Sequence, residues 1–210
     1  MAKTYRTGTR TSPLALKQVE EILQILRKFY PDFKAEVVGI DTYGDKDRAT
    51  PISEVEGSDF FTREIDEALL RGEIDPERSR SIDFAVHSAK DLPEQIPEGL
   101  YIVAITKSID SYDALVSKNG LKLAELPHGA RIGTSSFRRK TQLREYRDDF
   151  DIVDIRGNIE ERLKRLDAGD LDAIVIAASG LVRLGLEKRI TERIPFRIIK
   201  PHPLQGRWRY

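Results

Sequence analysis

Apolar side chains recur every three or four residues after the pair Ser12-Pro13. That spacing places them on one face of a helix, and serine followed by proline is typical of a helix start. The face consists of Leu16, Val19, Ile22, Leu23, Leu26 and Phe29. A second amphipathic helix is predicted over residues 60–72, where Gly72 would end it. The first third of the chain therefore contains two predicted helices, each with one apolar face.

Short apolar runs separate the helical patterns. They predict strands over residues 35–42, 82–86, 100–105, 113–117 and 150–155, and strand-to-helix units over 130–146, 150–169 and 171–185. Strands that alternate with helices favour an α/β fold with largely parallel sheets, in which ligands lie beyond the carboxyl ends of the strands. Segments near 105–112 and 195–203 are candidate crossings between two domains, the second because prolines cluster there.

Composition narrows the classes of function. The 210 residues are 40% hydrophobic and 33% charged, which is usual for a globular protein with a proper core. The 35 basic and 35 acidic residues cancel, so bulk charge gives no argument for a nucleic acid or an anionic membrane as partner. No apolar run has the length of a membrane span, and the first residues lack the apolar core of a signal peptide. Any anion site must be local.

Cysteine is absent, and the three histidines are scattered at His87, His128 and His202. The absence of cysteine excludes disulfides, thiolate nucleophiles and cysteine metal sites, and it fits a reducing cytoplasm. Scattered histidines argue against a zinc site. We therefore expect a cytoplasmic protein without a metal.

Three polar clusters lie where a predicted strand gives way to a helix. The stretch GTSSFRR (133–139) combines hydroxyl groups and two arginines at a helix start, where backbone N–H and guanidinium groups favour carboxylates or phosphates. A capped helix with a solvated basic face is an equally good interpretation. The stretch RGN (156–158) is a second such turn, with Asn158 as the candidate cap.

The third cluster is HSAKDLP (87–93), in which Lys90 and Asp91 follow an apolar strand. One interpretation is a solvated surface pair, which adds little stability. The functional alternative is a carboxylate that stabilises a cationic intermediate and moves protons. His87 alone is more often structural than catalytic. Taken singly, the clusters leave these alternatives open.

In collinear order, the clusters and their neighbours resemble the porphobilinogen deaminase family, also called hydroxymethylbilane synthase. The resemblance spans essentially the whole chain, and its motifs are together highly specific. They are GTRTSPLALKQ (8–18), GSDFFTREIDEALLRGEID (57–75), DFAVHSAKDLP (83–93), DALVS (113–117), RIGTSSFRRKTQL (131–143), IRGNIEERLKRLDAGDLDAIVIAASGLVRLGL (155–186) and PLQG (203–206).

The resemblance implies both a reaction and a fold. The family joins four porphobilinogen units into hydroxymethylbilane, releases ammonia, and grows the chain on a dipyrromethane cofactor attached to a cysteine. We therefore expect a transferase of heme biosynthesis that binds porphobilinogen and linear pyrroles. The expected fold has two α/β domains of the type II periplasmic-binding-protein kind, with mixed, mostly parallel sheets and a cleft between them. Residues 1–106 and 199–210 would form domain 1, and residues 107–198 domain 2.

The resemblance also assigns candidate site residues. Asp91 matches the catalytic aspartate, which holds pyrrole nitrogens and stabilises the azafulvene-like cation left by ammonia loss. Each pyrrole unit carries two carboxylates, so a growing chain needs many arginines. The cofactor-binding positions match Lys90, Ser88, Arg10, Ser12, Thr134, Ser135, Ser136, Arg138, Arg139 and Arg156. The substrate-binding positions match Arg10, Gln18, Arg156, Arg162 and Arg183.

Three departures from the family pattern matter. Ser58 replaces a cofactor-binding lysine and Asp59 replaces a glycine, which weakens a carboxylate site and adds negative charge. Residues 200–210 match the family's glycine-glutamine-glycine hinge only in part. The third, cysteine-bearing domain is expected to be absent, and no cysteine elsewhere could hold dipyrromethane through the family's thioether.

Three hypotheses follow. The first is a deaminase-type enzyme that binds dipyrromethane non-covalently or works with a separate chain supplying the third domain. The second is a module that binds a pyrrole or another polycarboxylate without turnover. The third is a degenerate paralogue with inert clefts. The retained Asp91 and the set of arginines favour the first hypothesis.

Overall fold

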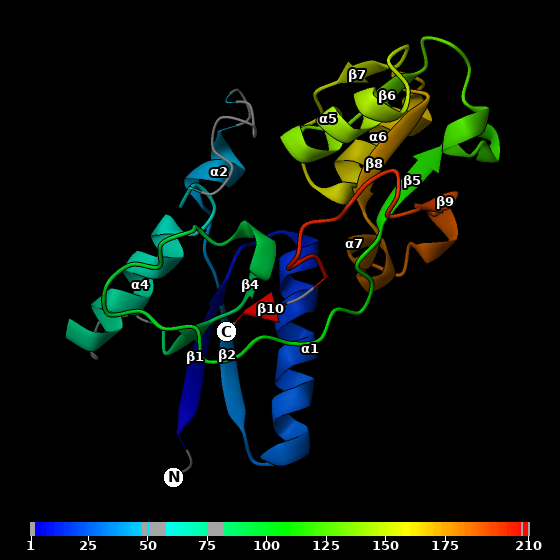
Figure 1. Ribbon diagram of the computed structural model, residues 1–210. Coiled ribbons are helices and arrows are strands. Elements are labelled where there is room, and N and C mark those ends of the chain that lie inside the picture. The colour runs from blue at the N-terminus through cyan, green and yellow to red at the C-terminus, as the bar shows by residue number, and fades with distance from the viewer. Residues whose placement is uncertain (1–2, 48–49, 51–57, 75–81, 207, 210) are drawn as a thin grey trace. The chain divides into compact units, whose positions relative to one another are not determined.

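The computed structural model describes residues 3–47, 50, 58–74, 82–206 and 208–209 (Figure 1). The chain divides into two compact units. Unit 1 comprises Met1–Asp47, Gly57–Lys107 and Arg207–Tyr210, and unit 2 comprises Arg48–Glu56 and Ser108–Gly206. Residues 199–206, which we expected in the first domain, group with unit 2, because Ile199 lies in its core and Gln205 bonds to Asp113.

Unit 1 is built on a parallel sheet with the order β2-β1-β3. Its strands are β1 (Thr4–Thr9), β2 (Lys34–Gly39) and β3 (Phe84–Ala85). Helix α1 (Pro13–Phe29) connects the first two strands, and the Ser12 hydroxyl accepts a hydrogen bond from the Ala15 N–H at 3.3 Å. The predicted helix start is therefore confirmed. Val19, Ile22 and Leu23 of α1 are buried against the sheet, as the apolar spacing indicated, whereas Leu16 and Phe29 of the predicted face are exposed.

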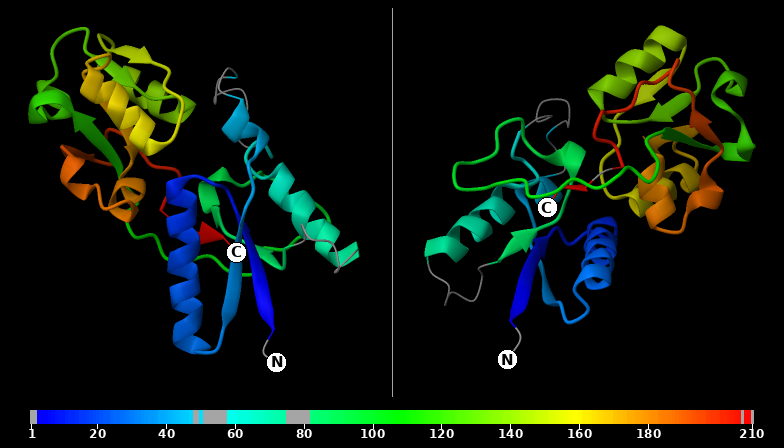
Figure 2. Two further views of the ribbon diagram at one scale, coloured as in Figure 1. Left: turned by 180° about the vertical axis from the view of Figure 1, so that it is seen from behind. Right: turned by 60° about the horizontal axis from the view of Figure 1, so that its bottom comes forward.

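The opposite face of this sheet is covered by α4 (Arg63–Ile74) (Figures 1 and 2). Ile65 and Ala68 of α4 pack against Ala85, whereas the neighbouring Phe84 packs on the side of α1. The prediction that Gly72 ends this helix is wrong, since α4 continues to Ile74. A glycine inside a helix costs only about 1 kcal/mol relative to alanine, so the helix can continue through Gly72. The short helix α2 (Tyr43–Lys46) precedes α4.

Beyond β3 the chain forms β4 (His87–Ser88) and the 3-10 turn η1 (Ala89–Asp91). Strand β10 (Trp208–Arg209) pairs with β4 in antiparallel fashion. The strand predicted over 100–105 is wrong: within the described residues, 100–104 join no sheet. Side chains there remain exposed, with 84% of Tyr101 and 74% of Val103 accessible, because no neighbouring strand covers them.

Unit 2 contains a five-stranded mixed sheet with the order β7-β6-β8-β5-β9. Strand β6 is parallel to β7 and β8, and β5 is antiparallel to β8 and β9. The strands are β5 (Asp113–Ser117), β6 (Arg131–Gly133), β7 (Asp151–Val153), β8 (Ala173–Ala177) and β9 (Glu192–Ile194). The run predicted over 113–117 is thus confirmed as β5.

Helices lie on both faces of this sheet. They are α5 (Phe137–Tyr146), α6 (Ile159–Ala168) and α7 (Ala178–Arg183), with short 3-10 turns η2 (Lys118–Gly120), η3 (Leu123–Glu125) and η4 (Glu187–Arg189). Alternate residues of a strand face opposite sides, so Leu115 packs with Leu143 of α5 while Val116 packs with Leu163 of α6. Among the described residues, no helix is long and apolar enough to cross a membrane.

The carboxyl ends of β6, β7 and β8 share one edge, because these three strands are parallel. The loops that follow β6 and β7 are joined there: the Thr134 N–H donates to the Val153 carbonyl at 2.9 Å. The Ser135 hydroxyl donates to the Ile155 carbonyl at 2.7 Å and accepts from the Ile155 N–H at 2.9 Å. Two of the polar clusters singled out in the sequence therefore lie side by side.

Gly44→Ala tests the packing of α2 against two aromatic rings. Helix propensity favours alanine by about 1 kcal/mol, but a Cβ here would collide with Phe61 and lie 2.6 Å from Phe60 Cδ1. We expect the substitution to lower the free energy of unfolding of unit 1 by roughly 1–3 kcal/mol. Urea denaturation would measure this, with the exposed Lys46→Ala in the same helix as control. A stabilised Gly44→Ala protein would contradict the described packing.

Candidate active site

The candidate site residues form two groups, one in each unit. In unit 1 they lie at the end of β1, on α1 and in the turn after β4. In unit 2 they lie in the loops after β6 and β7, at the starts of α5 and α6, and at the end of α7. Within the described part of the chain, no group of three or more acidic or histidine side chains could hold a metal ion. The chemistry of both groups therefore rests on carboxylates, hydroxyls and arginines.

Asp91 ends η1, directly beyond β4, and is half-buried. Among the described residues, its carboxylate has no hydrogen bond and no ion pair. Two other acids of unit 1 are paired, since Asp45 binds Arg10 and Asp83 binds Lys3 at 2.9 Å. The buried Asp66 of α4 has no counter-ion among the described residues, and its Oδ2 has no partner there. A partly desolvated carboxylate without a partner can accept N–H bonds from a ligand or stabilise a developing positive charge.

His87 interacts electrostatically with both Asp91 and Arg10. Burial lowers the pKa of His87 to about 4, with the Asp91 carboxylate acting to raise that pKa and the Arg10 guanidinium acting to lower it. Its Nε2 has no hydrogen-bond partner among the described residues. The imidazole is therefore neutral at pH 7, and it does not neutralise Asp91 by forming an ion pair.

Arg10 is held in place by Asp45, which sequence analysis did not single out. The Arg10 Nε lies 3.1 Å from both Asp45 oxygens, Nη2 binds the same carboxylate, and the guanidinium lies 4.5 Å above the Phe61 ring. Asp45 also accepts bonds from the N–H and hydroxyl of the buried Thr42. Burial acts to raise the pKa of Asp45, but Arg10 and Thr42 together lower it. Within the described residues, Nη1 of Arg10 remains without a partner.

Other predicted residues of unit 1 have structural partners. The buried Gln18 donates to the Ser88 hydroxyl at 2.8 Å, which joins α1 to β4. The Ser12 hydroxyl caps α1, so its oxygen already accepts a hydrogen bond from the Ala15 N–H. Lys90 is half-buried in η1 and has an interaction partner.

Ser58 and Asp59, which depart from the family pattern just before α4, both have partners within unit 1. Asp59 forms an ion pair with Arg63 at 2.7 Å, and the Arg63 hydrogen bond lowers the pKa of Asp59. The Ser58 hydroxyl accepts a bond from the Phe60 N–H at 3.3 Å. The negative charge that Asp59 adds is therefore balanced locally by Arg63.

The hydroxyl loop 134–136 lies between β6 and α5 in unit 2. Ser135 joins this loop to the loop after β7, and Ser136 precedes α5 without capping it through its side chain. The Thr134 hydroxyl is buried and has no partner among the described residues. An unpaired buried hydroxyl costs free energy unless a ligand or water satisfies it. Thr134 is thus a candidate ligand contact on structural grounds.

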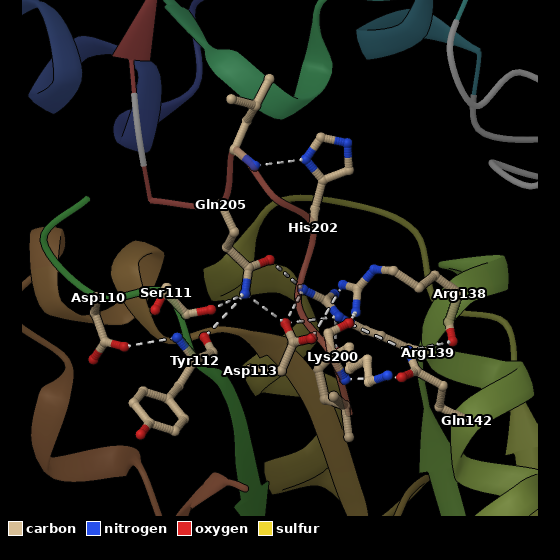
Figure 3. Close-up of polar contacts among 12 residues, drawn as sticks. Asp110, Ser111, Tyr112, Asp113, Arg138, Arg139, Gln142, Lys200, His202 and Gln205 are labelled. Carbon is tan, nitrogen blue, oxygen red and sulfur yellow. Dashed lines mark hydrogen bonds and ion pairs between the residues drawn. The ribbon is translucent and has the colours of Figure 1, made fainter. Parts of the chain in front are cut away.

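The two arginines that follow this loop share one buried carboxylate, Asp113 (Figure 3). Arg139 donates to Asp113 Oδ1 from Nε at 3.0 Å and from Nη2 at 2.6 Å, while Arg138 Nη2 donates to Oδ2 at 3.1 Å. The Asp113 side chain is 0% exposed, that of Arg139 7% and that of Arg138 24%. Burial acts to raise the pKa of Asp113, but the two arginines and Gln205 lower it to about 2.

Gln205 completes this cluster. Its Nε2 donates to Asp113 Oδ1 at 2.9 Å and to the carbonyls of Ser111 and Tyr112 at 3.0 Å (Figure 3). The Gln205 carbonyl accepts a bond from the Ser108 hydroxyl at 2.9 Å. Gln205 therefore fastens the returning segment 199–206 to the segment 108–113 within unit 2.

The three remaining arginines donate to backbone carbonyls. Arg156 binds the Thr50 carbonyl at 2.9 Å, Arg162 the Gly157 carbonyl at 2.8 Å and Arg183 the Gly206 carbonyl at 3.1 Å. Arg156 and Arg162 flank the capped start of α6, where Asn158 accepts from the Glu161 N–H at 2.9 Å. The predicted cap at Asn158 is confirmed.

Comparison with protein families gives these residues a context. The sequence model described as "Porphobilinogen deaminase, dipyromethane cofactor binding domain" matches residues 5–208. The chain belongs to the porphobilinogen deaminase family. Porphobilinogen deaminase of Citrifermentans bemidjiense is 46% identical over 204 residues, which cover 97% of this chain and 61% of the relative. That of Natranaerobius thermophilus is 46% identical over 202 residues, which cover 96% and 62%. The chain thus spans about three fifths of the length of these relatives.

Solved structures of other proteins share the fold of this porphobilinogen deaminase family member. A protein described as the substrate binding domain of a molybdenum ABC transporter from Clostridium difficile aligns with a TM-score of 0.60 at 11% identity, over 99% of this chain and 84% of that one. A sulfate-bound mutant OxyR2 regulatory domain from Vibrio vulnificus aligns with a TM-score of 0.51 at 14% identity, over 99% and 84%. These likenesses confirm the expected α/β fold of the type II periplasmic-binding-protein kind and say nothing of the ligand.

The neutral state of His87 makes the stability of the chain depend on pH. The folded pKa of about 4 lies below the usual value of 6.5, so the unfolded state takes up a proton first. We expect the free energy of unfolding to fall as pH drops from 6.5 to 4, by on the order of 3 kcal/mol. Urea titrations across this range would measure it, and His87→Gln should lack this part of the dependence. An identical dependence in His87→Gln would contradict the assignment.

Asp113→Asn tests the buried ion pair. We expect it to lower the free energy of unfolding by roughly 3–5 kcal/mol, because Arg139 would remain buried without a counter-charge. Asp113→Asn combined with Arg139→Gln should lower the free energy of unfolding by less than Asp113→Asn alone. Since the folded pKa of about 2 is depressed, the contribution is present above about pH 4 and is lost as pH falls toward 2. The exposed pair of Asp151 and Arg131 provides the control, since Asp151→Asn should cost under about 1 kcal/mol. Equal costs for Asp113→Asn and Asp151→Asn would contradict this account.

Proposed function

We propose that this chain catalyses the porphobilinogen deaminase reaction, in which porphobilinogen units are condensed with release of ammonia, and that it does so in the cytoplasm. Asp91 is the observation that carries the proposal. It is a half-buried carboxylate with no bond or ion pair among the described residues, in a chain that belongs to this family. The carboxylates of Asp45 and Asp113, by contrast, each have an arginine as counter-ion.

The reaction requires two contributions from Asp91, stabilisation of a positive charge and acceptance of a proton. When ammonia leaves, the bond between the aminomethyl carbon and its nitrogen breaks, and the electron pair leaves with the nitrogen. The positive charge that remains on the pyrrole and its methylene carbon is stabilised by the adjacent carboxylate. Attack by the next pyrrole carbon forms the new carbon–carbon bond and releases a proton, which a carboxylate can accept. The neutral His87 supports both roles, because it leaves the charge of Asp91 intact.

Binding of the substrate depends on cations and hydroxyl groups. Each porphobilinogen brings an acetate and a propionate, and guanidinium groups bind carboxylates in bidentate fashion. Arg10 in unit 1 and Arg138 in unit 2 are the arginines we assign first. Nη1 of Arg10 has no partner among the described residues, and Arg138 is partly exposed. Arg156, Arg162 and Arg183 remain candidates for further carboxylates.

Dipyrromethane is the cofactor that the family implies. The unsatisfied Thr134 hydroxyl, the neighbouring Ser136 and Arg138 form a donor set that suits its carboxylates. When bound, it supplies the pyrrole carbon to which the first porphobilinogen is joined. The 210 residues contain no cysteine, so we propose that dipyrromethane binds here without a thioether to these residues, or is carried by a cysteine-bearing polypeptide that acts together with them.

A pyrrole-binding module is the second candidate function, and the absence of a thiol from these residues favours it. Titration calorimetry with porphobilinogen and with a linear tetrapyrrole, alongside an assay for ammonia, would separate the two functions. Binding together with ammonia release supports the enzyme. Binding without release, even when dipyrromethane or a cysteine-bearing fragment is supplied, supports the module. Absence of binding contradicts both.

Asp91→Asn tests the assigned catalytic role. The amide preserves the shape but removes the charge, so we expect turnover to fall by about 100-fold or more while the protein stays folded. Tetrapyrrole formation from porphobilinogen measures turnover, and circular dichroism measures folding. The exposed Asp32→Asn in the same unit removes one charge elsewhere and should leave turnover unchanged. Full activity in Asp91→Asn would show that another group performs this chemistry.

A further inference from the structure

Arg138 has a second partner besides Asp113, and that partner is neutral. Its Nη1 donates to the Lys200 carbonyl, which belongs to the returning segment of unit 2 (Figure 3). Gln142, one helical turn further along α5, binds the same residue twice: its Nε2 donates to the Lys200 carbonyl at 3.3 Å, and its Oε1 accepts from the Lys200 N–H at 2.8 Å. The Lys200 carbonyl therefore has two donors.

The charges of this cluster do not balance. Arg138 and Arg139 bring two positive charges against the single negative charge of Asp113. The side chain of Arg139 is 7% exposed and directs two donors at one oxygen of Asp113, so this pair is internally neutral. The surplus positive charge lies on Arg138, which is the more accessible of the two arginines at 24% exposure.

The Lys200 carbonyl has a substitute donor in Gln142, whereas Asp113 Oδ2 has no donor besides Arg138 among the described residues. If Arg138 turned Nη1 from the Lys200 carbonyl to a carboxylate, Gln142 would still satisfy that carbonyl. Nη2 can stay on Asp113 Oδ2 and keep the guanidinium oriented while Nη1 turns. Leaving a buried polar group unpaired is what usually makes such an exchange costly. Here an anionic ligand can replace a neutral carbonyl without that cost.

We propose that Asp113, with Arg139 and Gln205, is a positioning group that holds Arg138 ready to bind a ligand carboxylate. In this arrangement Arg139 acts on Arg138 through Asp113. Gln205 fixes Asp113 from the returning segment, so the orientation of Arg138 is set by β5, by α5 and by residues 199–205 together. The inference rests on the proposed function, because it takes a pyrrole carboxylate as the ligand.

A double-mutant cycle on porphobilinogen binding tests this proposal. Asp113→Asn combined with Arg139→Gln removes one negative and one positive charge, so the net charge of the cluster is unchanged while Arg138 loses its anchor. We expect the Kd for porphobilinogen, measured by titration calorimetry on the 210-residue chain, to rise about tenfold. Arg138→Gln should raise it by at least as much. Adding the paired change to Arg138→Gln should produce no further rise.

One control and one further variant accompany this test. Arg144→Gln removes an exposed arginine from the same helix, outside the cluster, and should leave the Kd unchanged. Gln205→Met removes the amide bonds to Asp113 while keeping side-chain volume, and it should also raise the Kd; it replaces the paired change if that protein fails to fold by circular dichroism.

The outcomes separate the inference from the function on which it rests. If Arg138→Gln weakens binding but the paired change and Gln205→Met do not, or if their effects add to that of Arg138→Gln, the positioning role is refuted and the proposed function stands. If Arg138→Gln leaves the Kd unchanged, Arg138 binds no carboxylate and the inference falls. If the unmodified chain does not bind porphobilinogen, the proposed function fails and the inference fails with it.

Discussion

The buried carboxylate of Asp113 is the constraint on which unit 2 depends. A charge with no exposure must be paired, and Asp113 is paired by donors from two distant parts of the chain, Arg139 in α5 and Gln205 in the returning segment. Because α5 directly follows the hydroxyl loop 134–136, fixing its first turn also fixes that loop. The ion pair thus determines where the candidate ligand groups of unit 2 lie.

Unit 1 repeats this arrangement in another form. Asp45 holds Arg10, and Thr42 in turn holds Asp45. In both units a structural carboxylate restricts an arginine that is assigned to a ligand, and this lowers the conformational entropy lost on binding. Asp91 differs from these two acids, because no described residue pairs with it and the neighbouring His87 is kept neutral by burial. Asp45 and Asp113 thus position arginines, whereas Asp91 is the acid for which we propose the reactive role.

Local features of the fold could be predicted from the sequence. The Ser12 and Asn158 caps, the central part of the apolar face of α1 and strand β5 all depend on residues close in sequence, and all are found. The ends of that face, Leu16 and Phe29, are exposed. The strand at 100–105 was predicted wrongly because a short apolar run does not guarantee a neighbouring strand. Asp113 and Asp45 were missed as site residues, since their partners lie 26 and 35 residues away. Asp113 was noted only as the first residue of a strand, and nothing in its local sequence indicates a buried ion pair. The roles assigned to Asp91 and the arginines by family resemblance remain predictions.

Release of ammonia from porphobilinogen labelled at its aminomethyl nitrogen would test whether this chain catalyses the condensation. The chain would be incubated with the labelled substrate with and without added dipyrromethane, and labelled ammonia would be followed over time by mass spectrometry. This account predicts ammonia release that depends on dipyrromethane and matches the consumption of porphobilinogen one for one. If the chain binds both compounds but releases no labelled ammonia with either a free or a cysteine-bound dipyrromethane, Asp91 does not perform the proposed chemistry.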